Sequence, residues 1–135
     1  MIKKQIITWK KLDSLLQEFV DSYIKTVPVT CITGIPRGGA IIALLLSHKL
    51  NLPYVPIDVA KLGELKGQIL VVDDIADSGT TLDPFIADYW TYTLHWKQKS
   101  IAKPTFYSVE VPNEGVWIVY PWEKKDADTK PDYTI

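Results

Sequence analysis

The spacing of apolar residues along the chain predicts helices and strands in alternation. Apolar residues after Thr8 recur at helical spacing, and the Thr8 hydroxyl can cap the helix that they define. These residues are Leu12, Leu15, Leu16, Phe19, Val20, Tyr23 and Ile24. Residues 40–50 are almost wholly apolar and too long for a typical strand, so they predict a buried helix. A further helix is expected over residues 80–96.

Shorter apolar runs bounded by turn residues predict the strands. They cover residues 29–33, 54–57, 68–72, 100–102 and 105–111. A brief connection is expected over residues 58–67. Because strands alternate with helices as far as Val111, the sequence predicts an α/β domain whose mainly parallel central sheet is flanked by helices. Ligands of such sheets bind at the carboxyl ends of the strands.

The composition is that of an ordinary globular domain. Of the 135 residues, 47% are hydrophobic and 23% charged, and the net charge of −1 argues against wholesale binding of nucleic acid. No apolar run is long enough to span a membrane and no signal peptide begins the chain, so no membrane partner is expected. The single cysteine, Cys31, is expected to pack in a strand, and without a cysteine pair a cytoplasmic location is expected. Residues 1–123 are expected to form the domain and residues 124–135 a charged tail.

The most informative stretch is residues 69–82, in which an apolar strand ends in Asp73 and Asp74 and is soon followed by Asp77. Small residues that suit a phosphate come next: Ser78, Gly79, Thr80 and Thr81. At the start of a helix, such residues offer backbone N–H groups and hydroxyls to a phosphate. Carboxylates beside a phosphate site would repel the phosphate, so their presence indicates a second role. They could hold sugar hydroxyls or Mg²⁺. A ligand that carries both a ribose and phosphates accounts for all of these residues.

Two further stretches carry candidate chemistry. A loop after the first core strand contains Arg37, Gly38 and Gly39. The glycines let the backbone approach an anion and the arginine suits phosphate oxygens, although by itself the loop is equally consistent with an ordinary turn. Near the end of the domain, Trp117 offers a flat ring to a base and Lys103 a donor to an exocyclic oxygen. Chemistry alone favours packing for the tryptophan and a solvated charge for the lysine.

Together these stretches resemble the type I phosphoribosyltransferases. Residues 69–82 match the family's phosphoribosyl-pyrophosphate (PRPP) motif, which is an apolar strand, two acids, two intervening residues, then Asp-Ser/Thr-Gly and a threonine. The Arg-Gly-Gly loop is similar to the family's pyrophosphate loop, in which a cis peptide often precedes the arginine, here Pro36–Arg37. Ala-Lys-Pro, Trp-Ile-x-x-Pro-Trp and an early Thr-Trp pair resemble the bacterial xanthine–guanine branch, and the likeness runs from Ile6 to Glu123.

The resemblance implies transfer of a 5-phosphoribosyl group from PRPP to a 6-oxopurine (guanine, xanthine or hypoxanthine), with Mg²⁺ as cofactor and release of pyrophosphate. It implies that Asp77 is a general base near the purine N7. Asp73 and Asp74 would face the ribose hydroxyls or the metal, with Asp74 as the metal ligand. The phosphates would be held by Arg37, Gly38, Gly39, Ser78, Gly79, Thr80 and Thr81.

The resemblance also implies a base pocket and an assembly. Lys103 would read the purine 6-oxygen, Trp117 would stack on the ring, and the Ile118 backbone would meet the 2-position. The segment between Lys103 and Trp117 is short for the xanthine–guanine branch, which leaves the choice of base open. In the family a long flexible loop, called the hood, covers the reaction. Here only residues 58–67 occupy its place, so the hood is reduced. A homo-oligomer, either a dimer or a tetramer, is expected.

Two other functions stay open at this point. The reduced hood is consistent with a PRPP- or nucleotide-binding regulatory protein without efficient turnover. The short segment before Trp117 is consistent with a phosphoribosyltransferase for another base. Base consumption measured across purines and pyrimidines would separate these possibilities.

Overall fold

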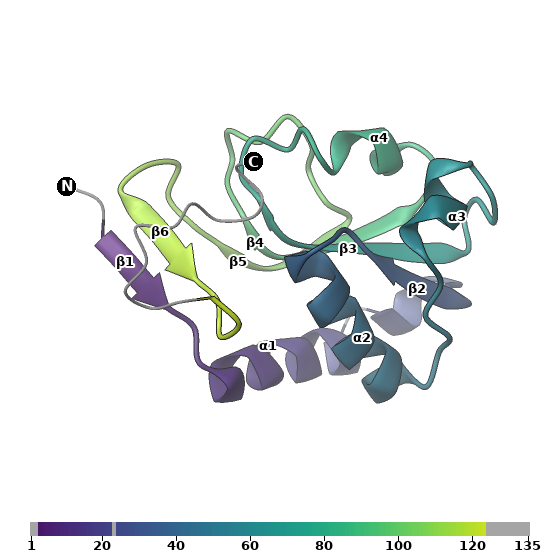
Figure 1. The fold of residues 1–135 in the computed structure, drawn as a ribbon, viewed down its shortest axis with the longest axis horizontal. Helices are drawn as coiled ribbons and strands as arrows, with labels where there is room; N and C mark the ends of the chain where they lie inside the picture. The colour runs from purple at the N-terminus through teal and green to yellow at the C-terminus, as the bar shows by residue number, and fades with distance from the viewer. Residues whose placement is uncertain (1–2, 23, 124–135) are drawn as a thin grey trace.

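The computed structural model of the protein describes residues 3–22 and 24–123 (Figure 1). Its helices are α1 (Trp9–Ser22), the 3-10 helix η1 (Ile24–Thr26), α2 (Gly38–Leu50), α3 (Ile57–Lys61) and α4 (Asp83–Ile86). Its strands are β1 (Lys3–Ile6), β2 (Cys31–Gly34), β3 (Ile69–Ala76), β4 (Trp90–Trp96), β5 (Phe106–Glu110) and β6 (Val116–Val119). The expected charged tail, residues 124–135, lies outside the described residues.

The central sheet has parallel strands in the order β2-β3-β4-β5. Its register is set by backbone pairs such as Ile32 with Leu70 and Val72 with Tyr92. β1 and β6 form a separate parallel pair, which brings the two ends of the described chain together (Figure 1). These features confirm the predicted α/β fold with a mainly parallel sheet.

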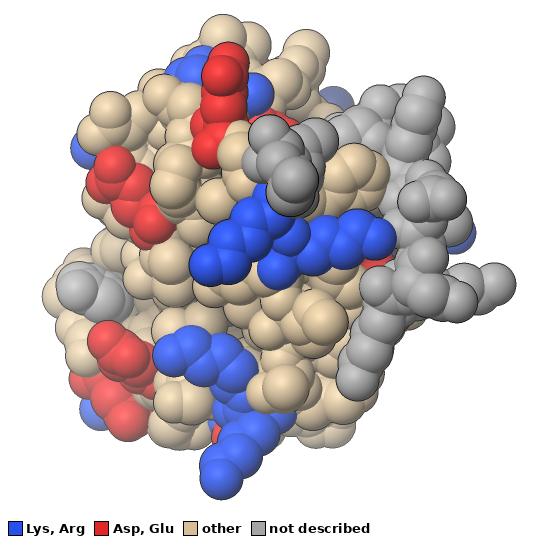
Figure 2. Space-filling view, turned by 90° about the vertical axis from the view of Figure 1, so that its left-hand side faces the viewer, with Lys and Arg blue, Asp and Glu red and all other residues tan. Residues whose placement is uncertain are grey.

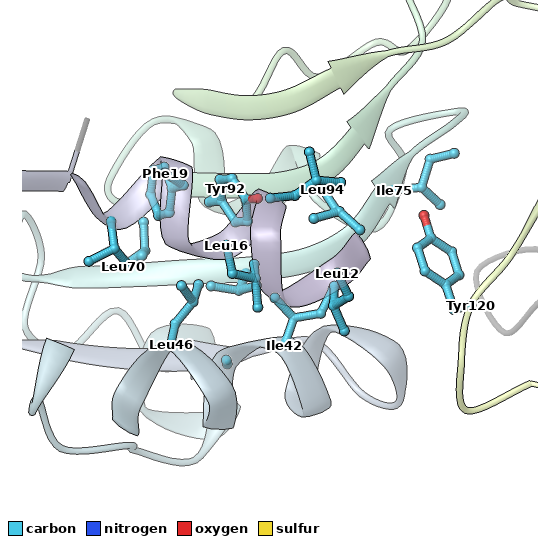
Figure 3. Packing of buried hydrophobic residues seen from close by; sticks show 14 of the residues in the cluster. Leu12, Leu16, Phe19, Ile42, Leu46, Leu70, Ile75, Tyr92, Leu94 and Tyr120 are labelled. Carbon is cyan, nitrogen blue, oxygen red and sulfur yellow. The ribbon is translucent and has the colours of Figure 1, made fainter. Parts of the chain in front are cut away.

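Helices cover both faces of the central sheet. On one face, α1 and α2 lie over β3 and β4, so that Leu16, Leu46, Leu70 and Tyr92 belong to one apolar cluster (Figure 3). On the other face, α3 and α4 contribute to a second apolar cluster that includes Val71. Burial on both faces explains why β3 reads as a continuous apolar run in the sequence.

The two longer helices agree with the predictions. Thr8 Oγ1 accepts a hydrogen bond from the Lys11 N–H (3.1 Å) and so caps α1. The buried face of α1 consists of predicted residues: Leu12, Leu15, Leu16, Phe19 and Val20. α2 begins at Gly38, slightly before the predicted start, and is followed by Asn51 with a left-handed φ of 52°. No helix within residues 3–22 and 24–123 is long and apolar enough to cross a membrane.

The helix predicted over residues 80–96 is wrong. This stretch contains the short helix α4 and then β4, which lies in the sheet between β3 and β5. β4 consists largely of aromatic and β-branched residues, which favour strands. Tyr92 and Leu94 pack in the cluster under α1 and α2, while Trp96 packs in the opposite cluster. A strand that is buried on both faces cannot be told from a buried helix by periodicity alone, which is why the sequence pattern misled.

The strand predicted over residues 54–57 is also wrong. Tyr54 makes an isolated bridge with Ile32, and α3 begins only three residues later. Pro53 and Pro56 flank this bridge, and a proline has no N–H to donate to a strand ladder. The stretch therefore touches the sheet at one point and then turns into α3.

The remaining strand predictions have mixed outcomes. Residues 100–102 form a turn rather than a strand, because the Ser100 hydroxyl donates to the Ala102 carbonyl and accepts from the Ala102 N–H. The other predicted strands are confirmed with shifted ends, and they correspond to β2, β3 and β5. β3 runs on to Ala76 and therefore includes the acidic pair that the sequence analysis placed just after the strand.

The connection between α3 and β3 is fastened to the turn that precedes β4. The Tyr89 hydroxyl donates to the carbonyl oxygens of Ala60 (3.2 Å) and Glu64 (2.7 Å). The indole N–H of Trp90 donates to the carbonyl oxygen of Gly67 (3.0 Å). The reduced hood expected from the sequence is therefore a tethered part of the domain.

Candidate active site

The glycine-rich loop between β2 and α2 packs directly against the end of β3. A Cβ atom at Gly38 would collide with the carboxylate of Asp74, and one at Gly39 would lie 2.8 Å from the Cα atom of Asp73. Glycine is therefore required at both positions for this close approach. The Pro36–Arg37 peptide bond is cis, as the resemblance implied. Two stretches that were predicted separately thus form one site at the carboxyl end of β3.

The acidic pair at this site is buried. Asp73 and Asp74 are 5% and 3% exposed, and their carboxylates accept hydrogen bonds from the next residues' N–H groups, those of Asp74 (2.9 Å) and Ile75 (2.8 Å). Burial raises the pKa of Asp74 to about 6. Burial, and then repulsion by Asp74, raise the pKa of Asp73 well above its ordinary value. Ionised carboxylates are therefore disfavoured here unless a positive charge joins them.

The donor set of this pair fits a magnesium ion that is shared with a ligand. Mg²⁺ is usually bound through one or two carboxylates together with phosphate oxygens and water. Among residues 3–22 and 24–123, no group of three or more His, Cys, Asp and Glu side chains could hold a metal ion alone. Asp73 and Asp74 would therefore supply only part of a coordination shell.

The hydroxyl-rich turn follows β3 directly. The hydroxyls of Ser78 and Thr80 are hydrogen-bonded to each other (2.8 Å), and both side chains, like that of Thr81, are exposed. Gly79 has a φ of +86°, and a Cβ atom there would lie 2.6 Å from the Ala102 nitrogen. A small pocket lined by residues of this turn, by Asp73 of β3 and by Asp77 opens here. Because α4 begins only at Asp83, the turn itself, rather than the start of a long helix, is suited to hold an anion.

Asp77 lies between this turn and two lysines that the sequence analysis did not single out. Its Oδ1 atom is 3.3 Å from the Nζ atoms of both Lys97 and Lys99. The Lys97 N–H donates to the carbonyl oxygen of Ala76 (3.0 Å), so the parallel register of β3 and β4 brings Lys97 beside Asp77. The Lys97 side chain is only 8% exposed, whereas that of Lys99 is 47% exposed. Lys97 is a charged residue directly after the buried strand β4, and this position was the available signal. The incorrect prediction of a helix over residues 80–96 concealed it.

The three predicted base-binding residues are not gathered around Asp77 by any contact in the described part of the chain. Lys103 is exposed, and its Nζ atom lies 5.1 Å from the ring centroid of Trp96. Trp117 is half-buried in β6 and paired with Lys4 of β1, while Ile118 is buried. The roles implied for these residues stay predictions.

The segment after β6 lies against the glycine-rich loop and the acidic pair. Tyr120 donates a hydrogen bond to the carbonyl oxygen of Asp74 (3.2 Å). The ring of Trp122 stacks on that of Tyr120, with centroids 5.1 Å apart, and lies 3.3 Å from where a Cβ atom of Gly38 would be. Trp9 lies beside Trp122, with centroids 6.1 Å apart. The sequence analysis assigned no role to Tyr120 or Trp122.

Positive charge is present on the side of the molecule that carries β1 and β6. Figure 2 views this side, and Lys and Arg side chains gather near its middle with acidic side chains around them. Arg37, at the N-terminal end of α2, is exposed. The guanidinium of Arg37 suits phosphate oxygens.

A parallel α/β sheet with a glycine-rich loop, a hydroxyl-rich turn and a buried acidic pair at its carboxyl edge defines the phosphoribosyltransferase class. The chain is 31% identical to a xanthine-guanine phosphoribosyltransferase of Cereibacter sphaeroides over 68% of each chain, and 26% identical to that of Vibrio parahaemolyticus over 97% of this chain and 96% of the relative. A purine phosphoribosyltransferase structure from Pyrococcus horikoshii has a TM-score of 0.75 and 26% identity, covering 94% of this chain and 99% of its own. No family model matches the sequence. The chain belongs to the type I phosphoribosyltransferases, in the family of the xanthine-guanine phosphoribosyltransferases.

Proposed function

We propose that the protein transfers the 5-phosphoribosyl group of PRPP to a ring nitrogen of a 6-oxopurine and releases pyrophosphate. Its relatives carry the names of enzymes with this type of activity, which favours turnover over the regulatory alternative. The observation that carries the proposal is the contact of Gly38 and Gly39 with the acidic pair. This contact supports the proposal because the glycine-rich loop, which we assign to pyrophosphate, lies next to carboxylates that suit ribose hydroxyls, and PRPP carries both groups at one end.

The residues take distinct parts in the reaction. The bond from the ribose C1 to the pyrophosphate oxygen breaks, a bond from C1 to N9 of the purine forms, and the proton that the purine loses passes from N7 to Asp77. Arg37 and the backbone of Gly38 and Gly39 hold the departing pyrophosphate. The turn over residues 78–81 holds the 5-phosphate. Asp74 would hold Mg²⁺, which would supply positive charge to balance the leaving group.

Lys97 is the better-placed donor to the purine 6-oxygen. In a 6-oxopurine, N7 and O6 lie side by side on one edge of the ring. Asp77 and Lys97 present a proton acceptor and a donor 3.3 Å apart, which matches that edge. Lys103, which the resemblance assigned to this role, remains the rival candidate, but its amine lies over Trp96. The ring of Trp117 and the backbone of Ile118 would complete the pocket.

The test is PRPP- and Mg²⁺-dependent formation of nucleotide from guanine, xanthine and hypoxanthine, with adenine for contrast. Adenine is expected to react poorly, because its 6-amino group would meet a lysine donor instead of offering an acceptor. Asp77→Asn is expected to lower the rate by a hundredfold or more while PRPP still binds. Binding of PRPP without consumption of any base would overturn the proposal in favour of a regulatory protein. The homo-oligomeric state and the cytoplasmic location remain predictions.

A further inference from the structure

Tyr120 stands where three strands of the described chain approach one another. It follows β6 directly and its side chain is buried, with 1% exposed. Its hydroxyl donates to the carbonyl oxygen of Asp74 in β3 (3.2 Å) and is 2.8 Å from Nδ1 of His95 in β4. Figure 3 shows this hydroxyl directed toward Ile75, the residue after Asp74. The proposed reaction gives no part to either Tyr120 or His95.

The directions of these hydrogen bonds follow from counting protons. The phenol has one hydrogen and gives it to Asp74, so it must accept a hydrogen from Nδ1 of His95. His95 is fully buried, and this burial lowers its pKa to about 4, so the ring is neutral and carries a single N–H. Nε2 has no partner among residues 3–22 and 24–123, which suits an unprotonated nitrogen better than a buried N–H. The chain of bonds therefore runs from His95 through Tyr120 to Asp74.

The ring of Tyr120 extends this link to the pyrophosphate loop. Trp122 stacks on it nearly in parallel, at an interplanar angle of 4°, and borders Gly38. On the other side along the chain, Tyr120 is separated from Ile118 by a single residue. One side chain thus connects the strand expected to bind the base with the backbone of Asp74, whose carboxylate is expected to face the ribose or the metal.

We propose that Tyr120, oriented by His95, is a positioning residue that fixes Asp74 relative to β6. In this role it sets the ribose end of PRPP against the base, although it touches neither substrate. The inference rests on the proposed function. Transfer requires C1 and the purine nitrogen to be aligned within a few tenths of an ångström, so a shift between β3 and β6 affects the rate more than it affects the binding of PRPP alone.

Tyr120→Phe tests this role, because it removes the hydroxyl and keeps the ring that stacks on Trp122. We expect kcat to fall about tenfold, which corresponds to one neutral hydrogen bond. The dissociation constant of PRPP with Mg²⁺, measured by calorimetry without base, is expected to change less than twofold. Tyr92→Phe is the matched control, since it removes another buried phenol hydroxyl, bonded to Ser108 in the core, and is expected to leave kcat unchanged.

Variants of His95 test the relay, which is the chain of hydrogen bonds from His95 through Tyr120 to Asp74. His95→Asn keeps an N–H donor near the position of Nδ1 and is expected to retain most of kcat, whereas His95→Leu should lose about as much as Tyr120→Phe. The double variant Tyr120→Phe/His95→Leu should be no slower than either single variant, because both remove one link. Losses that multiply would overturn the relay. Unchanged kcat in Tyr120→Phe, or an equal loss of PRPP affinity, would overturn the positioning role.

A readout independent of turnover separates this inference from the proposed function. In ¹⁵N-histidine NMR spectra, His95 should carry its proton on Nδ1 in the wild type and on Nε2 in Tyr120→Phe, with His48→Gln used to assign the signals. A wild-type signal from an Nε2–H tautomer would overturn the relay whatever the activity. If the wild type makes no nucleotide from any purine, the proposed function fails and the positioning role fails with it. An active wild type with an equally active Tyr120→Phe variant overturns the positioning role alone.

Discussion

Replacing Asp74 by asparagine is expected to stabilise the free protein while weakening its binding of PRPP with Mg²⁺. The two side chains have nearly the same shape, and the asparagine oxygen can still accept the hydrogen bond from Ile75 N–H (2.8 Å). The change therefore removes a buried negative charge without creating a cavity. A buried carboxylate without a positive partner costs free energy when it is ionised.

The size of the effect follows from the pKa of Asp74, which burial raises from 3.8 to about 6. Each pKa unit is worth about 1.4 kcal/mol, so ionised Asp74 destabilises the folded chain by up to about 3 kcal/mol. The pKa of Asp74 is higher in the folded than in the unfolded chain. Its contribution to the free energy of unfolding of the wild type is therefore fully present below about pH 4 and is lost as the pH rises through 6. For a domain of this size, 3 kcal/mol corresponds to an increase in Tm of about 10 °C.

Thermal unfolding at pH 8 and at pH 4, with and without PRPP and Mg²⁺, measures this effect. Asp74→Asn should unfold well above the wild type at pH 8 and close to it at pH 4, and the ligand should raise its Tm less than that of the wild type. Asp77→Asn is the control, because Asp77 is paired with Lys97 and Lys99 and its loss brings no such gain. Equal Tm values at pH 8, or a gain that persists at pH 4, would refute the reasoning.

Two further predictions concern the base pocket and the pH dependence of stability. Lys97→Met should raise the KM for guanine tenfold or more and Lys103→Met less than threefold, and the reverse order in steady-state kinetics would restore Lys103 as the donor to the 6-oxygen. Burial lowers the pKa of His95 from 6.5 to about 4, so the folded wild type should lose up to about 3 kcal/mol as the pH falls from 6.5 through 4, relative to His95→Asn. Denaturant unfolding of both proteins across this range measures the difference, and parallel pH profiles would show that His95 is not buried in a neutral form.

Much of the fold could be predicted because its signals are local. The helical spacing of apolar residues predicted α1, and an apolar run too long for a strand predicted α2. β4 could not be predicted in the same way, because Tyr92 and Leu94 face one apolar cluster while Trp96 faces the other. Only its place between β3 and β5 makes this segment a strand, and that place depends on pairing with distant residues.

The same difference between local and distant signals decides which residues of the candidate site could be predicted. Residues in contiguous motifs, such as the acidic pair and the turn over residues 78–81, could be found because their order along the chain carries the chemistry. Lys97 becomes part of the site only through the register that pairs Ile75 with His95. Tyr120 reaches Asp74 from 46 residues away in the sequence. Contacts of this kind leave no pattern in a single sequence.

The tethering of the segment before β3 has a consequence for the timing of the proposed reaction. In enzymes with a mobile cover, opening and closing often limit turnover, and ordering the cover draws on the binding energy of the substrate. Here Tyr89 and Trp90 already hold this segment in the free protein. Substrate entry and product exit then need no movement of this segment. The ratio of phosphoribosyl transfer to hydrolysis of PRPP then does not depend on closure of this segment. It depends on how fully the purine fills the space above Asp77 and so keeps water out.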